Sequence, residues 1–263
     1  MLMILAQAAN DVANGRGPDR GPIYTESNFE AFLAEPWSVA SNLAFLAMAA
    51  YWLIRLRGRY RQFPFLTSAV ALLLVGWLGG SVYHAFRAHW VWLAMDILPI
   101  IALCVAAAVY LWLRVLPKWW HTLLVVPPFL LVQRLTFWMV RARHIQLPRN
   151  IAIGVSYSTM ALLILAPALL VLRKHRWRDW RWPAAGVVCF LAALWSRAAD
   201  ANPPALLAAI GTHWLWHLFG AAAAFCVSVY LYKLRRDELR EQAPQVRQTP
   251  AAIPTAIESA HHE

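Results

Sequence analysis

The chain contains 263 residues, of which 60% are hydrophobic and 14% are charged, and its formal net charge is +11. Soluble domains average about 45–50% apolar and about 25% charged residues. This composition, with a mean hydropathy of +0.48, therefore excludes an ordinary soluble domain. The positive charge would also suit a nucleic-acid-binding protein, but it follows the segments between apolar stretches, so we expect no nucleic acid partner. A membrane protein is predicted.

Seven apolar stretches of about 20 residues follow one another along the chain, and this is the length that an α-helix needs to cross a hydrocarbon core of roughly 30 Å. They cover residues 36–55, 65–86, 90–113, 119–140, 150–172, 183–200 and 204–232. The predicted fold is therefore all-α, a polytopic bundle of seven transmembrane helices over residues 36–232. Residues 1–35 form an N-terminal extracytoplasmic segment, and the polar residues 233–263 are predicted to be a disordered cytoplasmic tail.

Basic residues set the predicted orientation. If the N-terminus lies outside, the inner segments contain twice as many basic residues as the outer ones, so the positive-inside rule predicts N-terminus out and C-terminus in. The inner set is Arg55, Arg57, Arg59, Arg61, Arg114, Lys118, Arg173, Lys174, Arg176, Arg178, Arg181, Lys233, Arg235 and Arg236, and the outer set is Arg16, Arg20, Arg87, Arg141, Arg143, Arg149 and Arg197.

Usage of 21 Arg against 3 Lys is typical of a GC-rich genome, and the chain has no N-x-[ST] acceptor for glycosylation. Both features favour a bacterial protein. We expect an integral protein of the inner membrane with its site towards the periplasm.

Five of the polar residues within the predicted spans are candidates for one site. Ser81 and His84 end the second span, Asp96 lies in the third, and His213 and His217 lie in the seventh. Each costs about 2.5–3.5 kcal/mol near the bilayer centre if it is charged, so such residues are functional candidates. Given the alternating directions of the spans, all five are expected in the outer half of the bundle: His84 near the outer end, Asp96 about two turns below it, and the histidine pair about three turns down the seventh span.

Further charged residues in the spans are interpreted as structural. Arg134 is expected to anchor a helix to a neighbouring group. Arg197 and Asp200 lie three residues apart near an interface, where they are interpreted as a local, snorkelling pair. Neither residue is assigned to catalysis.

The spacing of the histidines predicts a metal site. His213 and His217 are four residues apart, so they project from one helix face and can bind the same ion. With His84 they form the three-imidazole, one-open-position set of a hydrolytic zinc centre. Ser81 precedes His84 by three residues, which places a hydroxyl beside this ligand. Trp214 stands where a zinc protease of the HExxH type has its general-base Glu, so that class is disfavoured.

Two other readings of the histidines stay open at this point. Histidines from two helices are also the arrangement of axial haem ligands, but a haem leaves Asp96 and Ser81 without a role. The metal could instead be structural, in a seven-helix receptor or transporter.

Taken together, these motifs resemble the alkaline ceramidase family, within the larger group of seven-helix membrane hydrolases that includes the adiponectin-receptor-like proteins. The resemblance covers about residues 19–232. It rests on four stretches in this order: YTESNFEAFLAEPWSVASNLAFL, which contains Glu35 and Asn42, then GGSVYHAF, MDILPI and THWLWH.

The resemblance implies a zinc-dependent hydrolase that cleaves the amide bond of ceramide, or of a related N-acyl lipid, to a fatty acid and a lipid base. It implies that His84, His213 and His217 bind zinc and that Asp96 deprotonates the attacking water, with Ser81 aiding the oxyanion. The family spaces its serine four residues before the histidine, where this chain has Gly80. A shift of one position turns a side chain by about 100° on a helix. A lipid esterase of the same superfamily is an alternative.

A calcium site is also implied by the resemblance, on Glu26, Asn28 and Glu35. An aspartate is expected three residues before Glu26, but this position is Ile23, and Asp19 is the candidate substitute. Hard oxygen ligands suit calcium. Acidic residues before a span are equally typical of a solvated loop, and Glu35 precedes a proline at a predicted helix start.

Overall fold

The computed structural model describes residues 17, 19, 21–142 and 149–247. Residues 1–16 of the N-terminal segment, 143–148 of the third outer segment and 248–263 of the tail lie outside these ranges. The described chain is all-helical, without a strand, as expected. Its long helices are α2 (Pro36–Arg55), α3 (Pro64–Phe86), α4 (Trp90–Val115), α5 (His121–Ala142), α6 (Arg149–Lys174), α7 (Arg181–Ala199) and α8 (His213–Arg247), with two short 3-10 turns, η1 (Tyr60–Gln62) and η2 (Ala205–Leu207).

Six of these helices, all except α5, are long and apolar enough to cross a membrane. Their outward faces carry large apolar side chains, such as Leu98 on α4, Leu162 on α6 and Val188 on α7, which are about 60% exposed. A soluble protein rarely leaves so much apolar surface uncovered, whereas lipid tails cover it without cost. The protein is therefore a helical integral membrane protein. Seven spans and the orientation of the termini remain predictions.

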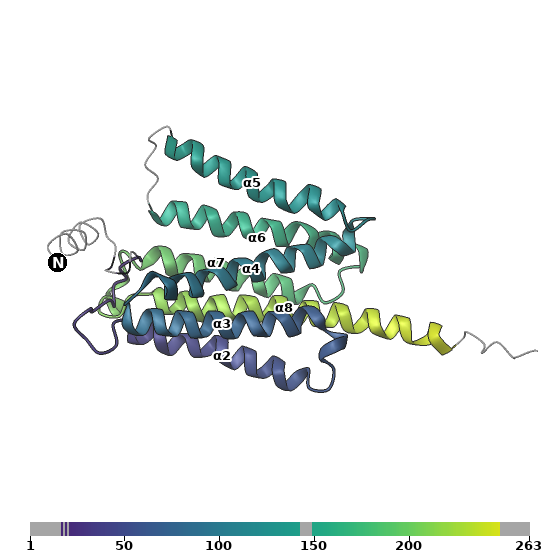
Figure 1. Cartoon of the computed structure of the whole chain (residues 1–263), viewed down its shortest axis with the longest axis horizontal. Helices are drawn as coiled ribbons and strands as arrows, with labels where there is room; N and C mark the ends of the chain where they lie inside the picture. The colour runs from purple at the N-terminus through teal and green to yellow at the C-terminus, as the bar shows by residue number, and fades with distance from the viewer. Residues whose placement is uncertain (1–16, 18, 20, 143–148, 248–263) are drawn as a thin grey trace, which may run out of the picture.

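The helices form a bundle in which sequence neighbours run side by side (Figure 1). Helix α8 packs against α7 and α2, α3 packs between α2 and α4, and α6 packs against α4. Helix α5 lies at the margin beyond α6. The N-terminal segment, drawn in purple, lies at the end of the bundle where α2 and α8 begin and α3 ends. We call this end the site end.

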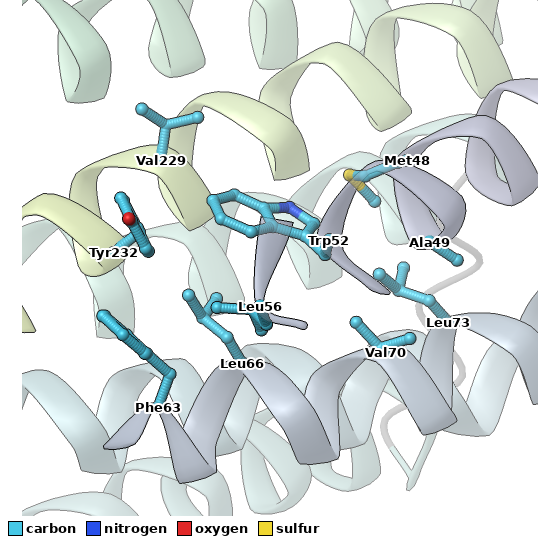
Figure 2. Close-up of a cluster of buried hydrophobic side chains, with 10 residues drawn as sticks. All are labelled: Met48, Ala49, Trp52, Leu56, Phe63, Leu66, Val70, Leu73, Val229 and Tyr232. Carbon is cyan, nitrogen blue, oxygen red and sulfur yellow. The ribbon is translucent and has the colours of Figure 1, made fainter. Parts of the chain in front are cut away.

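An apolar cluster joins α2, α3 and α8 towards the opposite end of the bundle (Figure 2). Trp52 is 1% exposed and lies at its centre, where its Nε1 donates to Ser228 Oγ at 2.9 Å. The ring of Phe63 stacks on Tyr232 with a centroid separation of 4.9 Å. The buried indole thus has its one donor satisfied, and the cluster joins three helices.

The first six predicted spans coincide with α2 to α7 to within two residues at each end. The seventh does not. Helix α8 begins at His213 instead of residue 204, because Pro203 and Pro204 cannot donate backbone hydrogen bonds and Gly211 takes a left-handed conformation with φ +66°. His213 is therefore the first residue of its helix and does not lie three turns down a span.

Helix α8 also continues to Arg247, into the predicted disordered tail. Ion pairs hold this extension to the rest of the bundle. Arg114 of α4 contacts Glu238 at 2.6 Å, and Lys233 contacts Asp179 of the α6–α7 connection at 2.5 Å. Polar residues that follow residue 232 thus have charged partners in the bundle, and composition alone does not reveal these partners.

Candidate metal centre

Three buried imidazoles meet at the site end of the bundle. His84 comes from the last turn of α3, and His213 and His217 come from the first turns of α8. The His84 ring centroid lies 5.4 Å from that of His213 and 4.8 Å from that of His217, and the last two are 4.8 Å apart. One nitrogen of each ring lies within 4.8 Å of the other two. The three histidines singled out from their spacing are thus brought together.

In two of the rings, Nδ1 makes hydrogen bonds to residues outside the cluster, which leaves Nε2 free to bind an ion. His217 Nδ1 lies 3.2 Å from the Ser38 carbonyl oxygen and 2.9 Å from Ser41 Oγ. Because a carbonyl only accepts, this nitrogen carries the proton and Nε2 keeps its lone pair. His84 Nδ1 contacts a Glu35 carboxylate oxygen at 2.5 Å. The same reasoning leaves His84 Nε2 as an acceptor.

Among the described residues, His84 Nε2 and His213 Nδ1 are buried and have no hydrogen-bond partner. Orphaned buried nitrogens are rare in folded proteins and call for an explanation. Tetrahedral zinc binds imidazole nitrogens at about 2.0–2.1 Å, which places them about 3.4 Å from one another. Nitrogens already within 4.8 Å need only small side-chain rotations to reach this geometry. The donor set therefore fits a divalent transition-metal ion such as zinc.

Glu35 belongs to a buried ionic network behind His84. Arg87 follows α3 in a left-handed conformation and donates to both Asp19 carboxylate oxygens, at 2.7 Å from Nε and 2.9 Å from Nη2. Its Nη1 donates to Glu35, which also accepts from Ser27 Oγ. Burial raises the pKa of Glu35 to about 7, while Arg87 and the Ser27 hydrogen bond oppose this rise. The network fixes the carboxylate that orients the ligand His84.

Glu26 has a different role, at the start of α2. Its carboxylate accepts from the backbone N–H groups of Trp37, at 2.8 Å, and Ser38, at 3.1 Å, and from the Ser38 hydroxyl. Pro36 opens the helix and has no N–H, so Glu26 satisfies the first donors that the helix leaves free. Burial raises the pKa of Glu26 to about 7, and these hydrogen bonds oppose the shift.

The residues predicted to bind calcium are not arranged around a shared empty space. Glu26 caps α2, the exposed Asn28 accepts from the Glu30 N–H at 3.1 Å, and Glu35 faces Arg87. A guanidinium already occupies the position between Asp19 and Glu35 that a cation would take. Calcium therefore does not fit this arrangement, and no step proposed below uses it.

Asp96 faces α3 at Gly80, the position four residues before His84. A Cβ placed on Gly80 would lie 2.5 Å from Asp96 Oδ1 and 3.0 Å from Asn42 Nδ2. One residue earlier, a Cβ on Gly79 would lie 2.4 Å from the Met95 Cβ. The two glycines let α3 and α4 approach closely, so that the Asp96 carboxylate lies against α3 one helical turn before His84. Ser81, at the next position, makes no hydrogen bond among the described residues.

Asn42 is a polar residue of the centre whose chemistry the sequence reasoning missed. It is 2% exposed, and its Nδ2 has no hydrogen-bond partner in the described part of the chain. Its position beside Gly80 places a free amide donor near the Asp96 carboxylate. The signal was present in the sequence, because Asn42 is a strongly polar residue one turn and a half inside an apolar span.

The start of α8 is capped by Asp200, another role that was not predicted. Asp200 Oδ1 accepts from the backbone N–H groups of Thr212 at 2.7 Å and His213 at 2.9 Å, and Oδ2 accepts from Thr25 at 3.1 Å. Tyr24, next to Thr25, stacks on the His213 ring with a centroid separation of 3.6 Å. Asp200 therefore fixes the His213 backbone, and Tyr24 of the N-terminal segment covers the His213 ring.

The geometry thus combines three metal-competent imidazoles with a carboxylate and a free amide donor. No family model matches the chain, and a search of curated proteins finds no match to it.

Proposed function

We propose that the protein is a zinc-dependent hydrolase of the membrane that cleaves the amide bond of ceramide or a related N-acyl lipid. The products would be a fatty acid and an amine-bearing lipid base. The observation that supports this best is the set of three buried imidazoles, two of which have orphaned nitrogens. A zinc ion held by His84, His213 and His217 would polarise the carbonyl group of the substrate and would let a water molecule ionise near neutral pH.

Asp96 is the proposed general base and acid. Its carboxylate lies against Gly80, one helical turn from His84, so it is held at the margin of the histidine cluster. It accepts the proton of the attacking water and then delivers it to the nitrogen of the leaving amine. A carboxylate that does both returns to its starting protonation state at the end of the reaction, so no net proton is gained or lost by Asp96.

Asn42 is the proposed donor to the carbonyl oxygen. Amide hydrolysis places negative charge on this oxygen in the transition state, and a preorganised N–H donor stabilises it. Asn42 Nδ2 is buried and unpaired, which is the state expected of a donor whose partner is the substrate. The sequence predicts that Ser81 supplies this hydrogen bond. In the structure, the position of α3 that faces Asp96 and Asn42 is Gly80.

Two groups of residues position the ligands. Glu35 accepts from His84 Nδ1, and the Ser38 carbonyl accepts from His217 Nδ1, so each ring presents Nε2 to the centre. Such partners outside the ligand set fix both tautomer and ring orientation. The lipid would enter sideways from the bilayer, and we place the site end on the periplasmic side of a bacterial inner membrane.

The test is release of fatty acid from a panel of N-acyl and ester lipids by detergent-purified protein, before and after chelation and with zinc restored. We expect zinc-dependent release from N-acyl lipids, and loss of release in His217→Ala. The matched control is His175→Ala, which removes a histidine outside the centre, after α6. Release from esters alone would favour a lipid esterase. No release from any lipid would favour a receptor or transporter with a structural metal.

A further inference from the structure

Arg197 is a helix arginine without an acidic partner in the part of the chain that the structure describes. Arg87 and Arg114 contact carboxylates within 2.7 Å. Within the described ranges, no carboxylate lies within 4.0 Å of Arg197, and its buried Nε has no hydrogen-bond partner. A buried guanidinium without a carboxylate within ion-pair distance is costly in a membrane helix, so its retention points to a function.

Asp200 was expected to pair with Arg197, and the structure shows why it does not. Both Asp200 carboxylate oxygens accept backbone N–H groups, from Thr212, His213 and Thr25. These bonds turn the carboxylate towards the start of α8 and the N-terminal segment. Arg197, three residues earlier, therefore makes no ion pair with Asp200.

The guanidinium lies beside the histidine cluster. Its carbon is 5.3 Å from the Trp216 ring centroid and 5.9 Å from the Tyr24 ring centroid. Trp216 precedes His217 in the chain, and the Tyr24 ring stacks on His213. Arg197 is thus one aromatic side chain away from two of the three candidate ligands. These aromatic side chains hold the guanidinium in place, while its buried Nε donor stays without a partner among the described residues.

We propose that Arg197 binds an anionic oxygen group of the lipid ligand, either the carboxylate of the fatty acid or a phosphate of the headgroup. The planar guanidinium offers paired N–H donors that match both groups. This inference deepens the proposed function and rests on it, because it assigns the anion to the same lipid site. It makes an acidic lipid, or the acidic product, a better ligand than a neutral lipid of equal chain length.

The experiment measures binding by calorimetry to metal-stripped protein in a non-ionic detergent, so its readout does not depend on catalysis. The probes are oleate, oleyl phosphate and oleyl alcohol. We expect the wild type to bind at least one anionic probe about tenfold or more tighter than the alcohol, and Arg197→Gln to abolish this preference. Preference for oleate would identify the carboxylate as the ligand, and preference for oleyl phosphate alone would identify the headgroup.

Arg134→Gln is the matched control, because it removes an arginine from the helix α5 at the margin of the bundle. This variant should keep the preference. Arg197→Lys, which keeps the charge but not the paired donors, should retain an intermediate preference, and it serves as the test if Arg197→Gln does not fold. Equal binding of the three probes by the wild type, or an unchanged preference in Arg197→Gln or Arg197→Lys, would overturn the proposal. A preference that persists in protein without hydrolytic activity would uphold the anion site while refuting the proposed function.

Discussion

Gly80→Ala tests whether close approach of α3 and α4 places Asp96 for catalysis. The added Cβ would lie 2.5 Å from Asp96 Oδ1, whereas such a carbon approaches a neighbouring atom no closer than 3.0–3.4 Å in real structures. The carboxylate must therefore move by about 0.5–0.9 Å, the difference between these distances. Misplacement of a catalytic group by about 1 Å can cost about 10²-fold in rate. We expect kcat/KM to fall by about 10- to 100-fold.

Stability should change little in this variant, because the displaced atom is the end of a side chain that can rotate. Overpacking typically costs about 1–3 kcal/mol, and the low end applies here. Gly76→Ala is the matched control, one turn earlier on α3, where a Cβ would meet Pro99 at an ordinary 3.4 Å. The assays are kcat/KM for an N-acyl lipid, metal content and Tm. Wild-type kcat/KM in Gly80→Ala, with metal content unchanged, would refute the role given to this approach.

Three further changes test the elements around the centre. Glu35→Gln should lower zinc affinity by about 10- to 100-fold in a competition with a chelating dye, since it loosens His84; unchanged affinity would contradict the positioning role. Arg87→Gln leaves two fully buried carboxylates uncompensated and should lower the free energy of unfolding in detergent by about 3–5 kcal/mol, against about 0–1 kcal/mol for the exposed Arg178→Gln. Burial raises the Glu26 pKa from 4.5 to about 7, so its contribution to stability is complete below pH 4.5 and is lost as pH rises through 7. Glu26→Gln should therefore lose less stability than the wild type between pH 5 and 8 in thermal unfolding scans, and parallel curves would argue against a buried, titrating Glu26.

Hydrophobic runs predicted the helices well because lipid requires every span to satisfy its own backbone hydrogen bonds. The ends of α2 and α3 were predicted within one residue, since Pro36 and Pro64 mark both starts. The start of α8 was missed because residues 204–212 are as apolar as a span. Pro204, the η2 turn and Gly211 end the helical pattern there, and composition averages do not register them.

The meeting of the three histidines was predictable from spacing and span direction. The partners that hold them were not, because each comes from a distant part of the chain. Glu35 lies 49 residues from His84, and Ser38 lies 179 residues from His217. Asp200, which caps α8, is bound in turn by Thr25, 175 residues away. Such contacts follow from tertiary packing, which no periodicity in a single sequence encodes.

The central claim is that His84, His213 and His217 bind one metal ion. The most direct measurement is elemental analysis with X-ray absorption spectroscopy at the zinc edge, on protein purified in detergent without chelators. We predict one zinc per chain, with three imidazole nitrogens at about 2.0–2.1 Å, and loss of the ion in His213→Ala. Purified wild-type protein without a bound transition metal, or a His213→Ala variant that keeps a full equivalent of zinc, would contradict the claim.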